Sequence, residues 1–489
     1  MNAAIIILKV LVAIVLLCSA PLALKRRWRL LLALPLSVFQ GFVPWSAVAG
    51  VPIPLAFWGG LMLWPESVRE FRNVITWKPT ACVLGIVVMY IVSMLWSTDR
   101  KIALQPIGYF LQFLVIFSAV VTEARRDEKL VLRLLALTAG LTLIQAIAIV
   151  IFYVMPGLKL AYLTSQLATW FVSPNTIENI LTTARNNGLS PGKSGGLDFT
   201  NANAAATHLG IVAFIAFGLA LHLRKRWLGV LAAMLLSAVA FTGSKAGVAL
   251  AVALPVLAAQ AITWRYRGWR NRLRMAMVAI ALVGVVAWLG PNAISAAEGD
   301  TYRALQGFFQ QSDMTLSVRE KIWAYGEQAF VQHPFKGQGF GGWQEDFPRY
   351  ARKVGIELDF PPHNTIIYLW SQAGLLGALL GVAFIYQVLK LGWQQLRNPA
   401  SSAFGLSLAM TLAFLWTFAQ GMGENFGLLG DIHMSPLLAT LLGLAYLHRR
   451  PRALRAVSRS QSTPIDPRVQ PLANSGTGMA GPFAAARTE

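Results

Sequence analysis

The chain has 489 residues, of which 56% are hydrophobic and 13% are charged, and its formal net charge is +21. Soluble domains carry about twice that charged fraction, so the composition excludes a soluble protein and indicates a polytopic membrane protein. The basic residues stand in short segments between apolar runs, which is an orientation signal and excludes nucleic acid as the expected partner. Cys18 and Cys82 both lie in apolar runs, so no disulfide framework or CxxC metal site is available.

Apolar segments follow one another along almost the whole chain. They lie at 3–24, 29–46, 49–64, 80–97, 103–121, 130–154, 204–222, 227–241, 245–264, 275–290, 364–389, 402–420 and 433–447. The first is interpreted as an anchored span and not as a cleavable signal, because the basic cluster at 25–29 follows it and resists translocation. Several segments are close to the minimum length for a span. We therefore predict an all-α polytopic membrane protein with about 12–13 transmembrane helices.

The loops between these segments alternate between basic and charge-poor. The basic clusters lie at 25–29, 69–78, 125–129, 224–226, 265–274, 390–397 and 449–455. Basic loops are retained in the cytoplasm, so this set and the C-terminus are predicted to be cytoplasmic. The two longest loops, 155–203 and 291–362, then lie on the outer face, and long structured loops of this kind are usually functional.

The predicted organisation has six parts. They are N-terminal transmembrane helices at 1–154, a first long outer loop at 155–203, central transmembrane helices at 204–290, a large helical outer loop domain at 291–362, C-terminal transmembrane helices at 363–448, and a disordered cytoplasmic tail at 449–489. The tail is rich in Pro, Ser, Ala and Arg and lacks apolar periodicity, so we assign it no chemistry.

The first outer loop carries Arg185, which precedes a glycine-rich stretch and the pair Asn201 and Asn203. Residues 192–194 read Gly-Lys-Ser and superficially suggest a nucleotide-binding P-loop. That motif needs a glycine where Asn187 stands, and it needs a preceding strand that the sequence does not offer. The P-loop is rejected, and Arg185 remains as a candidate anion ligand.

The second outer loop contains a predicted helix. Ser317 and Glu320 form a capping box, so the helix should begin there and end near Gln332, before a His-Pro pair. Arg319 falls in its first turn, where a cation is unfavourable unless an anion docks beside the free N–H groups. The alternative is an arginine that pairs with a nearby carboxylate.

Lys245 opens a span at the same outer face. It is either an interfacial anchor or a third cation that joins Arg185 and Arg319 around one diphosphate. Each ionic hydrogen bond to such a group contributes about 1.5–3 kcal/mol.

His363 stands directly before the apolar run of the next span, and Gly374 follows eleven residues later. Eleven residues make about three helical turns, so both are predicted to lie on one face of one helix. A neutral imidazole suits proton abstraction because its ordinary pKa lies near neutrality; the alternative is a histidine with a structural role. Glu357 and Asp359 with His363 form an unspecific metal-ligand spacing, so we expect no metal and no cofactor.

Taken together, these segments resemble the O-antigen ligase/polymerase superfamily of bacterial envelope enzymes. The matching parts are Arg185 with its downstream Asn pair, GSKAG at 243–247, S-x-R-x-x-x-W at 317–323, HPFKGQGFGGW at 333–343 and PPHN…QAGLLG at 361–377. His363 and Gly374 match the H-x10-G signature associated with the ligases. The resemblance covers roughly residues 160–390.

The resemblance implies a metal-independent glycosyltransferase of the bacterial inner membrane, with its active site facing the periplasm. Its donor would be an undecaprenyl-diphosphate-linked glycan, and its acceptor lipid A–core or another glycolipid. Carried over by position, Arg185 and Arg319 become diphosphate ligands and His363 the base, while Gly374 and Asn364 are structural residues at the site. Many members have Arg where this chain has Lys245, which keeps the charge and loses the bidentate fork.

Other functions remain open at this stage. A repeat-unit polymerase and a protein-glycosylating enzyme share the same parts, and H-x10-G favours the ligase. A lipid-linked glycan transporter should place polar residues near the middle of the membrane at broken helices. Here the polar residues gather at one face, which counts against a transporter. A structural scaffold is the remaining alternative.

Overall fold

The computed structural model describes residues 34–39, 65–183, 193–199, 201–266, 318–356, 360–398, 401–424 and 427–449. Within these ranges every regular element is a helix, which confirms the all-α class. The predicted spans at 3–24, 49–64 and 275–290 lie outside the described residues, as do Arg185, Glu357 and Asp359. The chain divides into one compact unit, Met1–His448, and a second, Arg449–Glu489, and all of the helices below belong to the first.

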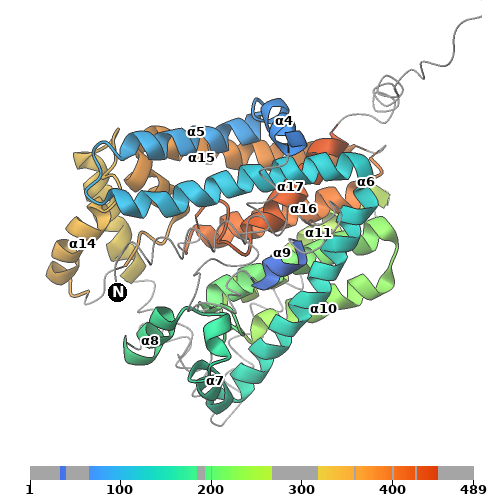
Figure 1. Cartoon of the computed structure of the whole chain (residues 1–489), viewed down its shortest axis with the longest axis horizontal. Helices are drawn as coiled ribbons and strands as arrows, with labels where there is room; N and C mark the ends of the chain where they lie inside the picture. The colour runs from blue at the N-terminus through green and yellow to red at the C-terminus, as the bar shows by residue number, and fades with distance from the viewer. Residues whose placement is uncertain are drawn as a thin grey trace, which may run out of the picture. The chain divides into compact units, whose positions relative to one another are not determined.

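The helices follow in chain order (Figure 1). They are α4 (Pro65–Val74), α5 (Lys78–Ser93), α6 (Arg100–Val154), α7 (Pro156–Leu163), α8 (Pro174–Thr183), α9 (Ala202–Leu223), α10 (Arg226–Ala240), α11 (Lys245–Tyr266), α14 (Gly342–Lys353), α15 (Thr365–Arg397), α16 (Phe404–Gly421) and α17 (Ser435–His448), with short 3-10 helices at Ser37–Phe39 and Ala168–Trp170. Residues 318–332 are also helical, which confirms the described part of the helix predicted from the capping box.

Five described helices are long and apolar enough to cross a membrane: α6, α9, α11, α15 and α16. The bent pair α4 and α5, which meet at 102°, would be a sixth span. α10 and α17 are equally apolar but have only 15 and 14 residues. The chain is thus a multi-pass membrane protein, and the total of 12–13 spans also counts residues beyond those described.

α6 joins two predicted spans in one element of 55 residues. Asp127 interrupts it with non-helical φ and ψ of −144° and 83°, and its carboxylate accepts a hydrogen bond from the Leu130 N–H at 3.1 Å. The basic loop expected between the two spans is therefore a sharp break, because one aspartate caps the second helical half as the first half ends.

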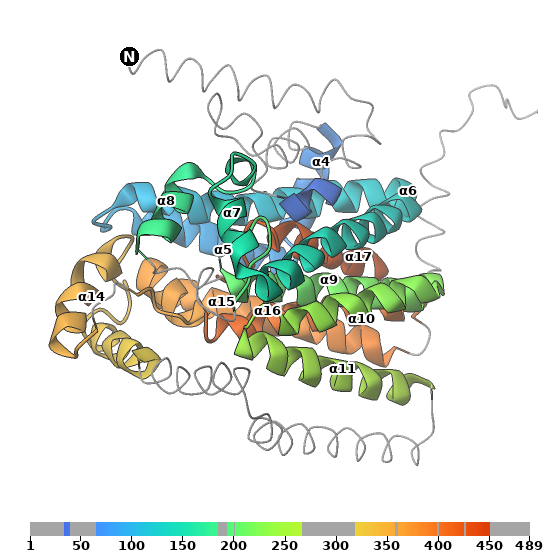
Figure 2. The same ribbon diagram turned by 90° about the horizontal axis from the view of Figure 1, so that it is seen from below.

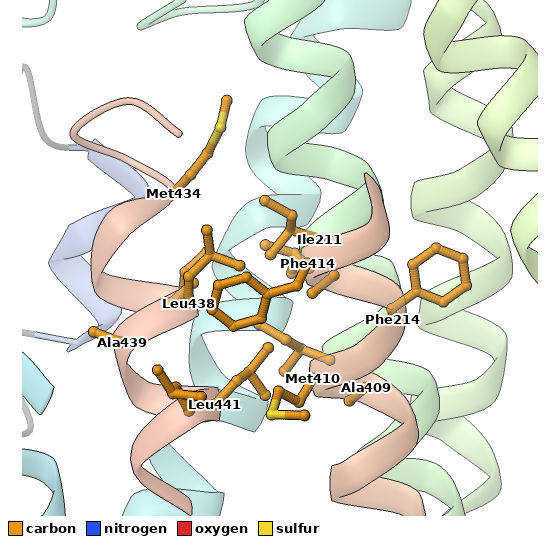
Figure 3. Close-up of a cluster of buried hydrophobic side chains, with 14 of the residues drawn as sticks. Ile211, Phe214, Ala409, Met410, Phe414, Met434, Leu438, Ala439 and Leu441 are labelled. Atoms are coloured by element: carbon orange, nitrogen blue, oxygen red, sulfur yellow. The ribbon is translucent and has the colours of Figure 1, made fainter. Parts of the chain in front are cut away.

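The core of the helical unit forms where α9, α16 and α17 pack together, as Figure 3 shows for side chains such as Ile211, Phe414 and Leu438. α9 and α16 approach closely through small residues. A Cβ added to Gly218 would lie 2.4 Å from the Gly405 carbonyl oxygen, so each glycine permits the other backbone to approach. α5 packs along α15, and α10 packs along α9 (Figures 1 and 2).

The predicted arrangement of His363 and Gly374 on one helix face is wrong. α15 begins at Thr365 with Asn364 as its N-cap, whose side-chain oxygen accepts hydrogen bonds from the N–H groups of Ile366 and Ile367. His363 lies before the cap with a φ of 49°, outside the helix. The Asn364 side chain caps the first turn of α15. The helix therefore begins after His363, and the histidine lies in the turn that precedes it.

Gly374 does not continue α15 either, since its φ of 72° and ψ of −174° break the helix. The turn at 335–339 docks on this break: the Phe335 carbonyl accepts from the Leu375 N–H at 3.0 Å, and the Ser371 carbonyl accepts from the Gln338 N–H at 2.8 Å. A Cβ on Gly374 would lie 2.1 Å from the Phe335 oxygen. Glycine is required here for its positive φ and for the close approach of the turn at 335–339.

Candidate active site

The ends of four helices meet at one polar site. The Gln420 side-chain N–H at the end of α16 donates to the Asn203 carbonyl in the first turn of α9 at 3.0 Å. The same group lies 3.4 Å from the Ser244 hydroxyl, which directly precedes α11. The Thr365 hydroxyl at the start of α15 donates to the Gly421 carbonyl at 3.0 Å. The opposite ends of α9, α11 and α15 carry or adjoin the basic residues Arg224, Arg265 and Arg397, so the site lies at the ends of these helices away from those arginines.

Glu424 is the centre of this site. It follows α16, its side chain is 6% exposed, and its Oε1 accepts from the Arg319 guanidinium at 2.5 Å and from the Asn203 amide at 2.7 Å. Burial raises the pKa of Glu424, while Arg319, Asn203 and Lys193 act in the opposite direction. A buried carboxylate with an ionic and an amide partner joins the segment after α16 to the helix at 318–332 and to α9.

His363 faces the other oxygen of the same carboxylate. Its Nδ1 lies 3.8 Å from Glu424 Oε2, beyond hydrogen-bond length, and this buried nitrogen has no hydrogen-bond partner among the described residues. The ring packs against Phe360, with centroids 5.8 Å apart. The Pro362 carbonyl accepts from the Trp323 indole N–H at 3.2 Å, which anchors the turn to the helix at 318–332. The nearby carboxylate favours the tautomer with the proton on Nδ1, which leaves Nε2 as the proton acceptor.

We expect His363 to titrate far below an ordinary histidine. Burial and then the neighbouring Arg319 lower the pKa of His363 to about 4, because both disfavour the imidazolium. The ring therefore stays neutral as the pH falls through 6.5 and takes up its proton only near pH 4. NMR spectra of the full chain with labelled histidine check this, with the His363 signal assigned by its absence from His363→Ala. A His363 signal that titrates near pH 6.5 would contradict the described environment.

Arg319 lies in the first described turn of the helix at 318–332, as the capping box predicted. It does pair with a carboxylate, the alternative set out for it, but this carboxylate is the buried Glu424 inside the site and not a solvated surface group. The Arg319 side chain is 27% exposed. The guanidinium has five N–H donors, so the pairing leaves donors for a second anion.

The segment 193–199 brings a further cation to the site. Its backbone is fixed from three directions: the Ser194 N–H donates to the Thr242 carbonyl at 3.1 Å, the Leu197 N–H to the Gln145 side chain at 3.0 Å, and Asp198 pairs with His433 at 2.8 Å. Burial disfavours the charged form of His433, yet Asp198 and Asp431 outweigh it and raise its pKa to about 10. Asp198 and Asp431 therefore favour the protonated form of His433.

Lys193 begins this fixed segment and is electrostatically coupled to the site. Burial lowers the pKa of Lys193, and Glu424 and Arg319 act on it with opposite signs. Arg319 pairs with the buried Glu424 carboxylate, and Lys193 is a second cation that is electrostatically coupled to it. Clustered cations of this kind favour an anionic ligand.

Three other predicted site residues are described by the structure: Lys245, Asn364 and Gly374. Lys245 is the first residue of α11 and directly follows Ser244, so its backbone lies beside the site. Asn364 caps α15 and also donates to the Met422 carbonyl at 3.4 Å, which joins it to the segment before Glu424. Gly374 lies at the break of α15, where it contacts the turn at 335–339 and is separate from the Glu424 site. In the described part of the chain, no three His, Cys, Asp or Glu residues are grouped as metal ligands.

Sequence reasoning missed Glu424 and Lys193. Glu424 is the single charged residue in the segment 421–430, between two apolar runs. This isolated carboxylate is the sequence feature that could have identified it as a site residue. Lys193 was discarded together with the P-loop. The backbone at 193–199 forms neither a helix nor a strand, which agrees with the rejection of the P-loop. Lys193 in this segment is nevertheless electrostatically coupled to the site.

The fold and the site define a multi-pass membrane protein. Its candidate site combines cations with a histidine and a buried carboxylate, at the ends of α9, α11, α15 and α16. The model of the O-antigen ligase family matches residues 230–382. The match covers about a third of the chain, and over that segment the chain is similar to the O-antigen ligase family. The matched segment contains Lys245, Arg319, His363 and Gly374. Comparison with curated protein sequences gives no match.

Proposed function

We propose that the protein is an O-antigen ligase. It would transfer a preassembled glycan from undecaprenyl diphosphate to a hydroxyl group of lipid A–core. The single observation that carries this proposal is the convergence of Arg319, Glu424 and His363 from three separate segments of the chain. An anion-binding group beside a neutral proton acceptor is what the transfer of a sugar from a diphosphate to a hydroxyl requires.

In the proposed reaction the acceptor hydroxyl oxygen attacks the anomeric carbon of the donor sugar. The new bond forms as the bond between that carbon and the diphosphate oxygen breaks, and the diphosphate leaves with the electron pair. The hydroxyl proton passes to Nε2 of His363. Arg319 stabilises the negative charge that grows on the leaving group, and Lys193, Arg185 and Lys245 are proposed as ligands that bind the diphosphate of the donor.

Glu424 has a positioning role in this proposal. Its carboxylate holds Arg319 by an ionic hydrogen bond and faces Nδ1 of His363. Burial is the main cause of the lowered pKa of His363 and Arg319 is the second, so a bound diphosphate that neutralises the Arg319 charge would raise the basicity of the histidine in part.

The location of these groups supports an enzyme over a transporter. Arg319, His363, Glu424 and Lys193 all lie outside the described spanning helices, at one end of the bundle. A transporter of lipid-linked glycans needs its polar groups near the middle of the membrane. Near the site, one described candidate span, α15, is broken at Gly374. The backbone of the turn at 335–339 forms hydrogen bonds at this break.

Replacing Lys193 with glutamine is expected to raise KM for the lipid-linked donor by about tenfold or more while kcat changes less. An ionic hydrogen bond to the diphosphate contributes about 1.5–3 kcal/mol, and it is made in the ground state as well as in the transition state. Steady-state kinetics with purified protein checks this. Lys336→Gln, at an exposed lysine of the outer turn, is the matched control. An unchanged KM in Lys193→Gln would remove Lys193 from the donor site.

The product that accumulates without the protein distinguishes the ligase from its alternatives. Deletion of a ligase should remove long-chain glycan from lipid A–core and leave lipid-linked polymer in the membrane. Electrophoresis of extracted lipopolysaccharide and of lipid-linked glycan measures both. Accumulation of single lipid-linked repeat units would instead identify a polymerase, and normal glycan on lipid A–core would contradict the ligase proposal.

A further inference from the structure

A groove lies far from the proposed active site, at the end of the helices where the basic residues gather. It has a volume of about 610 Å³ and is lined by α6 and by the junction of α9 with α10. The lining residues are Lys129, Leu132, Arg133, Ala136, Leu137, Gly140, Leu223, Lys225, Trp227 and Leu228. The α6 residues recur every three or four positions, so they form one stripe along the helix.

Three cations lie along one part of the groove, and none of them forms an ion pair with a described carboxylate: Lys129, Arg133 and Lys225. The neighbouring arginines differ, since Arg125 pairs with Glu70 and Arg126 with Glu66.

The acidic residues next to Lys129 are engaged elsewhere. Asp127 accepts from the Leu130 N–H at 3.1 Å, and Glu128 lies 2.7 Å from His448. Three positive charges therefore lie along the groove without an ion pair to a carboxylate among the described residues.

The rest of the groove is apolar. Leu132 and Leu228 form a buried floor, while Leu137 and Trp227 are 45% and 54% exposed. A Cβ on Gly140 would meet no atom within 4 Å, so the groove is open at this glycine. From Lys129 to Gly140 the stripe runs for about 16 Å along the helix, which matches a head group followed by part of an acyl chain.

We propose that this groove binds an anionic glycerophospholipid. The lipid phosphate lies among Lys129, Arg133 and Lys225, and one acyl chain lies along the leucines toward Gly140. Basic pockets between spanning helices suit acidic lipid head groups, and the apolar wall adds the burial of acyl CH₂ groups. Charge complementarity selects this occupant over a neutral lipid. The site is independent of the proposed glycan transfer, because it is built from other residues at the other end of the helices.

The test measures phosphatidylglycerol binding to the purified full-length protein by native mass spectrometry, with phosphatidylcholine as the neutral lipid. The wild type should bind phosphatidylglycerol at least about tenfold more tightly than phosphatidylcholine. The triple variant Lys129→Gln, Arg133→Gln and Lys225→Gln should lose at least about tenfold in phosphatidylglycerol affinity, because the favourable increments of three charges are removed. The matched control is Arg69→Gln, Arg72→Gln and Lys78→Gln, which removes the same charge from exposed positions of α4 and α5.

A second pair of variants tests the acyl part. Gly140→Leu places a side chain in the open groove and should weaken phosphatidylglycerol binding, whereas Gly108→Leu, at an equally open position of α6, should not. Equal affinity of the wild type and the charge variant for phosphatidylglycerol would overturn the proposal, and so would equal affinity of the wild type for the two lipids. Displacement of bound phosphatidylglycerol by inorganic phosphate alone would also overturn it, because the groove would then recognise a free anion.

Discussion

Replacing His363 with alanine is expected to reduce glycan transfer by at least about a hundredfold while the protein stays folded in the membrane. Positioned general bases contribute roughly 10²–10⁴ in rate, and the proposed mechanism gives no other described group the role of the base. His363 lies in a turn before α15, where its ring contacts Phe360. Its removal should therefore lower the transfer rate far more than the stability of the fold.

The measurement that checks this is the transfer rate of purified protein at saturating donor, together with donor affinity. Donor affinity should change by less than a few-fold, since the proposed diphosphate ligands are cationic and His363 is neutral. His333→Ala, at an exposed histidine of the same outer segment, is the matched control and should retain full activity. Full activity in His363→Ala would remove the histidine from the mechanism.

Replacing Arg319 with alanine is expected to reduce transfer by about 10²–10³, because the proposed mechanism uses the arginine as a fixed cation beside the charge that grows in the transition state. This variant also leaves the buried Glu424 carboxylate without its ionic partner. Breaking a buried pair in this way costs about 3–5 kcal/mol of stability. Loss of activity in Arg319→Ala alone is therefore not sufficient evidence.

Two further variants separate stability from chemistry. Arg319→Lys keeps the charge but loses the planar fork, so it should remain folded and still lose at least about tenfold in kcat. The double variant Arg319→Ala and Glu424→Gln removes the unpaired charge, so it should regain thermal stability without regaining transfer. Arg352→Ala, at an exposed arginine of α14, is the control. Wild-type kcat in the stable double variant would exclude Arg319 from transition-state stabilisation.

The described helices could be predicted from the sequence because the membrane imposes a strong local rule. A span needs about twenty apolar residues with all backbone groups paired within the helix, so hydropathy alone gives limits close to those observed. The prediction of 204–222 corresponds to Ala202–Leu223, and 402–420 corresponds to Phe404–Gly421. The helix that carries Arg319 was predicted for an equally local reason, a capping box and a terminal His-Pro pair.

The interruption of α15 was not predicted, although its residues were visible. Asn364 is the N-cap of α15 and stands where the predicted span 364–389 begins, but the apolar run after it suggested an uninterrupted helix. Glycine is common inside membrane helices, so Gly374 did not signal a break. The break is stabilised by the turn at 335–339, which supplies the hydrogen bonds that the helix loses, and no local pattern specifies that contact.

The site itself could be predicted only in part. Arg319 and His363 came from motifs near each other in the sequence, while Glu424 lies in a separate loop and joins them through tertiary packing of α16 against α9 and α15. No spacing rule connects residues that meet in this way. The position of Lys193 depends on the segment 193–199, which the Asp198–His433 pair helps to fix. Asp198 and His433 are far apart in the chain, so no sequence pattern indicates that they meet.

The central claim is that this site transfers a glycan from a diphosphate carrier to lipid A–core. The most direct measurement combines purified full-length protein with a defined undecaprenyl-diphosphate-linked glycan and either lipid A–core or a second lipid-linked glycan, in the presence of EDTA. We predict glycan attached to lipid A–core with release of undecaprenyl diphosphate, at equal rates with and without EDTA, and no product from His363→Ala. Folded wild-type protein that transfers glycan to neither acceptor would contradict the claim, and transfer only to the second lipid-linked glycan would replace the ligase with a polymerase.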